Sequence, residues 1–321
     1  HRSIVNHLAA RQRDFPLRPE DRFLQKASFS FDISVWEIFA PLATGAQSVL
    51  ATPEGQRDSG YLSRLMARFK VSVAHFGPAL MQLIVTDPEF EKCKSLRRMF
   101  CGGEPLSLLL QELFFALNPN ELISQYGPTE ATVDVTWCRC DREQPDQPAP
   151  IGRPMANTQA YILDPSLQPV PVGVAGELHI GGVALARGYL NRPELTAEKF
   201  IANPFDPAPG ARLYRTGDIC RYRPDGLIEF IGRTDHQIKI RGYRVELGEI
   251  EAVLQQHPDV VKVVVDVRAD GQDDKRLLAY VQPRAGATAG SHEFRDFLRA
   301  RLPDYMVPML FATVGEFPLT P

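Results

Sequence analysis

The sequence predicts an α/β protein in which a large domain of layered sheets and helices is followed by a small α+β domain. Short β-like runs alternate with helical patterns in the first part of the chain, an order typical of a largely parallel sheet covered by helices. Seven prolines then occur within residues 145–171, and hairpin patterns follow them. From residue 237 the pattern becomes strand, helix, strand, strand, helix, which indicates a separate unit of about 85 residues.

The expected elements follow from apolar periodicity and turn residues. A helix opens the chain, because Ile4, Val5 and Leu8 share one helical face. The large domain then contains strands at 71–74, 98–101 and 122–125, helices at 78–85 and 105–117, and a hairpin at 221–231 that turns at Pro224-Asp225-Gly226. The small domain contains helices at 248–256 and 291–302 and strands at 260–267 and 277–282. The boundary falls near 232–236, so the predicted domains are 1–234 and 235–321.

Composition excludes several classes of protein. Hydrophobic residues make up 44% of the 321 residues and charged residues 23%, which excludes a disordered tail, a collagen-like repeat and a small disulfide-rich scaffold. The 36 basic and 39 acidic residues give a net charge of −3, which argues against a nucleic-acid partner. Five irregularly spaced cysteines without a Cys-x-x-Cys pair predict free thiols in a reducing cytoplasm rather than a zinc site.

No membrane partner is expected either. The densest apolar stretch, 105–117, is shorter than the roughly 20 residues that a membrane span needs, and it contains Glu112. No signal peptide opens the sequence as given. His75 and His179 lie among apolar residues and are expected in the core or in a pocket.

Two turns contain residues suited to binding a nucleotide. In Ser124-Gln-Tyr-Gly-Pro-Thr-Glu130, the Thr129 hydroxyl and the Glu130 carboxylate form a pair that can hold a phosphate oxygen and Mg²⁺, which binds carboxylates together with substrate phosphates. A solvated surface turn is the alternative. In Leu213-Tyr-Arg-Thr-Gly-Asp218, the Asp218 carboxylate can accept hydrogen bonds from a ribose diol, with an ordinary Asx turn as the alternative.

Three further segments have distinctive patterns. Residues 232–244 contain four cations and precede an acidic helix start, which indicates either a solvated strand face or contacts with a phosphate. The glycines of residues 176–190 indicate close packing. Ser34 and Glu37 form a capping box that predicts a helix start, and it places Asp32 two residues before the cap. At that position Asp32 can pair with an ammonium group, or it is a solvated or second-choice capping residue.

These segments occur in a fixed order together with Leu302-Pro-Asp-Tyr-Met-Val-Pro308, and over its whole length the chain resembles the adenylation domain of nonribosomal peptide synthetases. The resemblance implies a large adenylate-forming domain and a small C-terminal lid. It implies that an amino-acid carboxylate attacks the α-phosphate of ATP, giving aminoacyl-AMP and pyrophosphate. The aminoacyl group then passes to the phosphopantetheine thiol of a peptidyl carrier domain, in an assembly line that also contains a condensation domain. Positioning and charge neutralisation dominate such chemistry.

The resemblance also implies roles for individual residues. On the nucleotide side, Tyr126 stacks on adenine beside Gly127, Gly103 and Glu104 line the adenine pocket, and Asp218 binds the ribose hydroxyls with Arg233 beside it. For catalysis, Thr129 contacts a phosphate, Glu130 holds Mg²⁺, and Lys239 and Gly242 face the site in the second half-reaction. Asp235 matches the hinge of the lid.

The amino-acid pocket implied by the resemblance consists of Asp32, Ile33, Trp36, His75, Phe100, Gly102, Gln125, Val133 and Asp134. Asp32 is expected to pair with the α-ammonium group, and Gly102 to leave room. A protonated His75 could meet a side-chain carboxylate, whereas Asp134 would oppose one. The set predicts glutamate or glutamine as the substrate, with serine as the alternative.

Parts of the resembled family's pattern lie beyond both ends of this sequence. A lysine-containing phosphate loop would precede His1, and a lysine motif would follow Pro321. We therefore expect the 321 residues to adenylate poorly or not at all by themselves. The alternatives are an acyl-CoA or aryl-acid ligase, which needs no carboxylate for an ammonium group, and a non-catalytic fragment that binds a partner domain.

Overall fold

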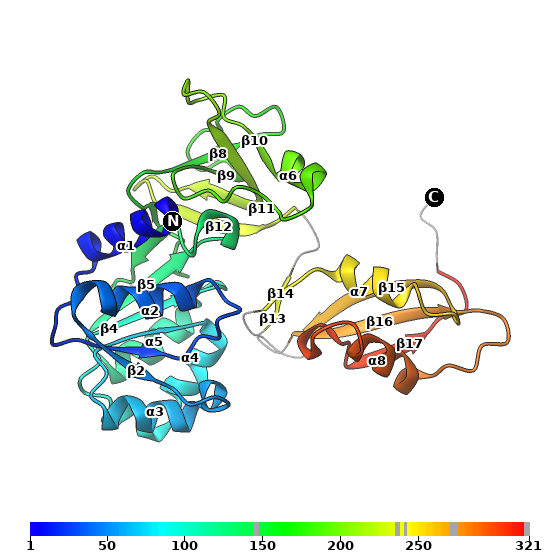
Figure 1. Ribbon diagram of the computed structural model, residues 1–321, viewed down its shortest axis with the longest axis horizontal. Coiled ribbons are helices and arrows are strands. Elements are labelled where there is room, and N and C mark those ends of the chain that lie inside the picture. The colour runs from blue at the N-terminus through cyan, green and yellow to red at the C-terminus, as the bar shows by residue number, and fades with distance from the viewer. Residues whose placement is uncertain (144–147, 235–237, 241–242, 270–274, 318–321) are drawn as a thin grey trace. The chain divides into compact units, whose positions relative to one another are not determined.

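The computed structural model describes residues 1–143, 148–234, 238–240, 243–269 and 275–317 (Figure 1). They belong to two compact units, His1–Thr234 and Asp235–Pro321. The first unit contains two sheets and the second a three-stranded sheet and a short hairpin. This mixed architecture confirms the predicted α/β class.

The first sheet of the first unit has seven strands in the order β2-β1-β3-β4-β5-β6-β7. The first five in this order are parallel, and β6 and β7 are antiparallel to their neighbours. The strands are β1 (Arg22–Gln25), β2 (Gln47–Leu50), β3 (Val73–Phe76), β4 (Arg98–Gly102), β5 (Glu121–Tyr126), β6 (Thr136–Arg139) and β7 (Arg153–Pro154).

Helices bury both faces of this sheet, as expected for parallel strands with continuous apolar runs. Strand β4 shows the alternation: Met99 and Cys101 join one core, whereas Phe100 packs with Phe23 and Trp36 in another. The first core includes residues of α3 (Ser59–Arg68), α4 (Pro78–Val85) and α5 (Leu108–Leu117). The second includes residues of α1 (Arg2–Asp14) and α2 (Ile33–Thr44).

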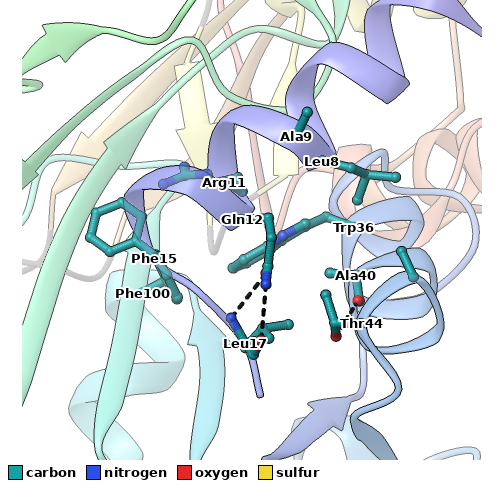
Figure 2. A pocket seen from close by; sticks show the side chains of 11 residues that line it. Leu8, Ala9, Arg11, Gln12, Phe15, Leu17, Trp36, Ala40, Thr44 and Phe100 are labelled. Carbon is teal, nitrogen blue, oxygen red and sulfur yellow. Dashed lines mark hydrogen bonds between the residues drawn. The ribbon is translucent and has the colours of Figure 1, made fainter. Parts of the chain in front are cut away.

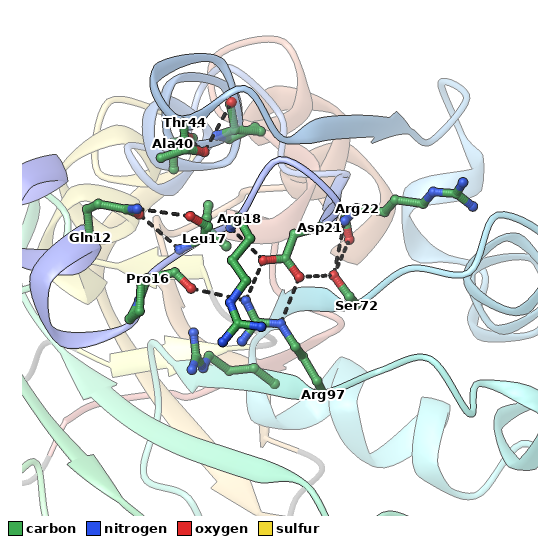
Figure 3. A network of polar contacts seen from close by, with 12 residues as sticks. Gln12, Pro16, Leu17, Arg18, Asp21, Arg22, Ala40, Thr44, Ser72 and Arg97 are labelled. Carbon is green, nitrogen blue, oxygen red and sulfur yellow. Dashed lines mark hydrogen bonds and ion pairs between the residues drawn. The ribbon is translucent and has the colours of Figure 1, made fainter.

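A polar network ties the start of β1 to the neighbouring strands (Figure 3). The buried Asp21 carboxylate accepts hydrogen bonds from Arg97 Nε and Ser72 Oγ, both at 2.7 Å, and from the backbone N–H of Arg18 at 2.8 Å. Burial alone would raise the pKa of Asp21, but these hydrogen bonds outweigh it and lower the pKa to about 2. The carboxylate is therefore ionised and holds the edges of three segments together.

The second sheet of the first unit is antiparallel, in the order β10-β11-β9-β8, with β12 also paired to β11. Its elements are β8 (Thr158–Leu163), β9 (Gly176–Gly182), α6 (Pro193–Lys199), β10 (Phe200–Ala202), β11 (Arg212–Tyr222) and β12 (Ile228–Arg233). The predicted turn at residues 224–226 joins β11 to β12, where Asp225 Oδ1 accepts the backbone N–H of Leu227.

The second unit packs two helices on its three-stranded sheet. Strands β15 (Val260–Ala269) and β16 (Lys275–Pro283) are antiparallel, and β17 (Leu310–Thr313) runs parallel to β16. Helices α7 (Leu247–Leu254) and α8 (Ser291–Arg299) bury Ile250 and Phe294 in a common core. Strands β13 (Ile238–Ile240) and β14 (Tyr243–Val245) form the hairpin.

Local sequence signals predicted some element boundaries better than others. The helix expected at 78–85 has those bounds, with Pro78 at its first position. The helix expected from residue 105 begins at Leu108 instead, because Ser107 caps it by accepting the N–H of Leu110. The strand expected at 71–74 lies at Val73–Phe76, two residues later.

The capping box predicted at Ser34 and Glu37 is wrong. Helix α2 begins at Ile33, with Asp32 at the N-cap, and the Ser34 hydroxyl donates back to the carbonyl of Phe31 at 2.7 Å. The Glu37 carboxylate is buried and accepts the backbone N–H groups of Lys26 and Ala27 at 2.9 and 2.7 Å. Glu37 thus binds the loop after β1 rather than the end of its own helix.

The five cysteines are all free. Within the described ranges, no helix has the length and apolar character needed to cross a membrane.

Candidate functional site

Three segments selected from the sequence meet at Asp218. Tyr126 ends β5, Asp218 lies in β11, and Arg233 is its cross-strand neighbour in β12. The Tyr126 hydroxyl donates to Asp218 Oδ2, and Arg233 Nη1 donates to Oδ1 at 2.5 Å. Arg233 Nη2 also donates to the carbonyl of Thr216 at 3.0 Å. Two sheets therefore contribute to one polar cluster.

The electrostatics of this cluster favour a charged Asp218 beside a neutral phenol. Burial, reinforced by the negative charge of Asp218 and by the hydrogen bond to it, raises the pKa of Tyr126 well above its usual value. The phenol therefore remains a hydrogen-bond donor.

The turn after β5 brings Thr129 to the start of α2. Gly127 is required there, because a Cβ atom at this position would lie 2.2 Å from the Cα of Asp134. Thr129 Oγ1 donates to Asp32 Oδ2 at 2.7 Å, joining two segments that are 97 residues apart. Burial raises the pKa of Asp32 in spite of this hydrogen bond. A cation next to Asp32 would relieve that burial cost.

Glu130 is held by a residue that the sequence analysis did not select. The Tyr189 hydroxyl donates to Glu130 Oε1 at 2.6 Å, and the backbone N–H of Ala186 donates to the Glu130 carbonyl at 2.8 Å. Thr196 Oγ1 accepts the backbone N–H of Tyr189 and so anchors the loop. The segment 176–190, predicted to serve close packing, therefore also orients the proposed metal ligand.

The carboxylate of Glu130 suits Mg²⁺ only if oxygen atoms of the substrate complete the coordination of the ion. In the part of the chain that the structure describes, no group of three or more His, Cys, Asp or Glu residues is arranged to hold a metal ion. Mg²⁺ typically takes one or two carboxylates together with substrate phosphates. Glu130, fixed by Tyr189, is a suitable single protein ligand of that kind.

The residues of the expected amino-acid pocket come mainly from adjacent strands and from α2. His75 of β3 is the register partner of Phe100 in β4, and Gly102 of β4 is the partner of Gln125 in β5. The Trp36 ring of α2 lies edge-on to Phe100, with ring centroids 4.8 Å apart. Asp32 and Ile33 are at the start of α2, and Val133 is buried in the core with Trp36 and Phe100.

Asp134 has two partners in α1 that the sequence analysis missed. The Arg11 guanidinium forms an ion pair with its carboxylate, and His7 Nε2 lies 3.0 Å from Oδ1. Arg11 Nη2 also donates to Gln125 Oε1 at 3.1 Å. All of these side chains are buried. The sequence contained a pattern that could have identified these partners. His7 and Arg11 are four residues apart, on the same face of a helix whose other inward positions are apolar.

Three expectations about this pocket are corrected. His75 is not protonated, because burial and the nearby cations Lys26 and Arg11 lower its pKa well below its usual value. Asp134 is not a free carboxylate, because Arg11 neutralises it. The space beside Gly102 is already filled, since a Cβ atom there would lie 2.6 Å from Gln125 Cγ.

Gly103 and Glu104 also belong to the first unit. Gly103 directly follows β4, with a φ of +95° that favours glycine, and Glu104 comes next. Lys239 belongs to β13 in the second unit. Asp235 and Gly242 are outside the described residues.

A cavity of about 210 Å³ lies between α1, α2 and β4 (Figure 2). Arg11, Trp36 and Phe100 contribute to its wall, and its other lining residues are mainly apolar. Gln12 closes one side by exchanging two hydrogen bonds of 2.9 Å with the backbone of Leu17. The cavity thus adjoins two residues of the expected amino-acid pocket.

Comparison with known proteins relates both units to one enzyme family. Residues 1–190 match the AMP-binding enzymes, and residues 249–321 match the C-terminal domain of AMP-binding enzymes. Tyrocidine synthase 3 of Brevibacillus parabrevis is 49% identical over 320 residues, which are 100% of this chain and 5% of that protein. The chain therefore spans only a small part of this curated relative.

Two solved structures share the fold. An adenylation domain of Vibrio cholerae in complex with glycyl-adenosine-5′-phosphate has a TM-score of 0.86 and 27% identity, over 97% of this chain and 59% of that one. A nonribosomal peptide synthetase protein with adenylation and PCP domains, bound to a vinylsulfonamide inhibitor, has a TM-score of 0.82 and 31% identity, over 94% and 52%.

Proposed function

The chain belongs to the family of AMP-binding enzymes, and we propose that it forms part of an amino-acid adenylation domain of a nonribosomal peptide synthetase. The observation that carries this proposal is the cluster of Tyr126, Asp218 and Arg233, because it joins an aromatic ring, a carboxylate and a cation at one place. The similarity to tyrocidine synthase 3 and to adenylation domains supports the choice of reaction.

In the proposed first half-reaction, a carboxylate oxygen of the amino acid attacks the α-phosphorus of ATP. The bond from that phosphorus to the bridging oxygen breaks, and pyrophosphate leaves with the electron pair. No side-chain nucleophile is required, so the contribution of the protein is positioning and electrostatic stabilisation. Asp218 accepts the ribose hydroxyls, the Tyr126 ring contacts the base between Gly103, Glu104 and Gly127, and the Thr129 hydroxyl donates to a phosphate oxygen.

Asp32 would bind the α-ammonium group of the amino acid. Its carboxylate is half-buried at the N-cap of α2 and already accepts a hydrogen bond from Thr129. This contact couples the ammonium-binding residue to the phosphate-binding residue, so the two substrates would be aligned by one pair of side chains. Mg²⁺, held through Glu130 and the phosphates of ATP, would supply neutralisation of phosphate charge.

In the proposed second half-reaction, the thiol of a phosphopantetheine arm attacks the acyl carbon and AMP leaves. The arm belongs to a peptidyl carrier domain, and a condensation domain would use the resulting thioester. Lys239 would face the site in this state, after a rotation about Asp235. The solved structure that combines adenylation and PCP domains supports a carrier partner.

An acyl-CoA or aryl-acid ligase is the second candidate, because it shares the first half-reaction. A substrate without an ammonium group has no use for the half-buried carboxylate of Asp32, whose pKa is raised by desolvation. Replacement of Asp32 by alanine should therefore abolish dependence on amino acids under our proposal and have little effect on a simple carboxylic acid substrate.

The proposal is tested by amino-acid-dependent ATP–pyrophosphate exchange with the full-length protein, together with AMP titration into the 321-residue chain. We expect AMP binding to the chain, and exchange that one or a few of the twenty amino acids stimulate. Exchange stimulated only by acids that lack an amino group would identify the second candidate. Absence of AMP binding by the folded chain would refute the proposed nucleotide site.

A further inference from the structure

Arg11 of α1 contacts four residues of the expected amino-acid pocket. It pairs with the carboxylate of Asp134, donates to Gln125 Oε1, and its guanidinium carbon lies 5.5 and 5.3 Å from the ring centroids of Trp36 and Phe100. The side chain is 3% exposed. A cation buried this deeply, beside two aromatic rings and a carboxylate, is a structural component of the pocket wall.

The charges in this wall balance. Burial, together with the neighbouring Arg11, lowers the pKa of His7 to about 3, and burial lowers the pKa of Arg11 only to about 9. At neutral pH, Arg11 is therefore charged and compensates Asp134, while His7 and His75 are neutral. An additional buried charge on a substrate side chain would lack a counter-ion and would be costly.

The orientation of Gln125 follows from the same contact. Its carbonyl oxygen accepts from Arg11, so its amide NH₂ group is directed toward other acceptors. Helix α1 was not among the segments from which the pocket was assigned, so this link between Arg11 and the pocket comes from tertiary structure.

We propose that Arg11 is a positioning residue that determines which side-chain charge the amino-acid pocket accepts. By neutralising Asp134 and orienting Gln125, it makes the pocket select an uncharged hydrogen-bonding side chain, such as that of glutamine or serine, over glutamate and over cationic side chains. This inference rests on the proposed function.

Asp134→Asn provides the first test, because it leaves Arg11 as a buried cation without its carboxylate. In the full-length variant, activity with glutamate should rise relative to activity with glutamine. The ratio of the two kcat/KM values, measured by ATP–pyrophosphate exchange, should change by about tenfold or more. The double variant Asp134→Asn with Arg11→Met should lose this gain, since the cation that recruits the carboxylate is removed.

The reciprocal single variant, Arg11→Met, leaves Asp134 uncompensated. It should raise the relative kcat/KM for ornithine and lysine. This change should be smaller than that in Asp134→Asn, because His7 faces the same carboxylate and can take up a proton that partly compensates its charge. Arg11→Lys keeps the charge and should keep the wild-type order of substrates. Arg13→Met is the matched control on the same helix, since Arg13 is exposed and pairs with Asp14.

Thermal unfolding of each variant separates selectivity from loss of structure. The inference is refuted if the folded Asp134→Asn variant keeps the wild-type substrate preference. It is also refuted if the double variant, which lacks Arg11, keeps the increased relative activity with glutamate. A wild-type protein whose exchange responds to no amino acid would instead refute the proposed function, so the two failures are distinguishable. A loss of activity that is equal for all amino acids would also overturn the proposal, because it would reduce Arg11 to a stabilising residue.

Discussion

Asp218→Asn is the most informative single change in the nucleotide site. The carboxylate is buried and accepts hydrogen bonds from Tyr126 and from Arg233. The amide keeps one acceptor oxygen but loses the other, together with the negative charge that pairs with Arg233. If Asp218 binds the ribose diol, the variant loses charge-assisted hydrogen bonds to the hydroxyls, each of which contributes about 1.5–3 kcal/mol.

A net loss of about 2 kcal/mol corresponds to a roughly 30-fold rise in the Kd for AMP. Isothermal titration of the 321-residue chain with AMP and with 2′,3′-dideoxy-AMP measures this directly. In the wild type, removal of the two hydroxyls should weaken binding by a comparable factor. In the variant, the dideoxy nucleotide should bind about as well as AMP, because the carboxylate that senses the hydroxyls is gone.

Glu229→Gln is the matched control. Glu229 pairs with Arg221 at 2.7 Å across the same two strands, but this pair is solvent-exposed. Its loss should cost at most about 1 kcal/mol of stability and leave the Kd for AMP unchanged. Wild-type affinity in Asp218→Asn, or an unchanged penalty for the dideoxy nucleotide, would show that Asp218 does not bind the ribose.

Three other changes test contacts that hold the fold and the proposed metal ligand. Asp21→Asn should lower the free energy of unfolding at pH 7 by about 1–3 kcal/mol. Because the folded-state pKa of Asp21 is lowered to about 2, the stabilisation by its carboxylate is present above pH 4 and is lost as the pH falls toward 2. Denaturation curves recorded at pH 7 and pH 3 should therefore differ less for the variant than for the wild type. Gly127→Ala should cost about 2 kcal/mol or more in urea denaturation, because its Cβ would clash with the backbone at Asp134, whereas Gly248→Ala in α7, with nothing within 4 Å, should be neutral or stabilising. Tyr189→Phe removes the hydroxyl that fixes Glu130 and should raise the Mg²⁺ concentration for half-maximal ATP binding by about tenfold in a titration. An unchanged Mg²⁺ concentration would show that Glu130 does not hold the metal.

Much of the architecture was predictable because it depends on local periodicity. The alternation of apolar strands and helices in the first unit, the helix at Pro78–Val85 and the turn at residues 224–226 follow from side-chain patterns within a few residues. The ordered motifs also indicated that Tyr126, Asp218 and Arg233 belong to one site. Their roles as nucleotide ligands remain predictions.

The capping box shows the limit of local reasoning. Ser34 and Glu37 have the correct spacing for mutual capping, but Glu37 binds the backbone of Lys26 and Ala27 from another segment. A buried carboxylate takes whichever donors compensate its desolvation, and the spacing alone does not identify those donors.

The fold class, the order of the elements and the segments that carry polar groups were all predictable from the order of side chains along the chain. Tertiary structure decided which of these groups meet: His7 lies 127 residues from Asp134 along the chain, and Glu130 lies 59 residues from Tyr189. The charge states of His75 and Asp134 also depend on it, because they follow from burial and from cations on other elements. Local periodicity reports which side of an element faces inward, whereas electrostatics depends on distances in space, and these are set only when the elements pack.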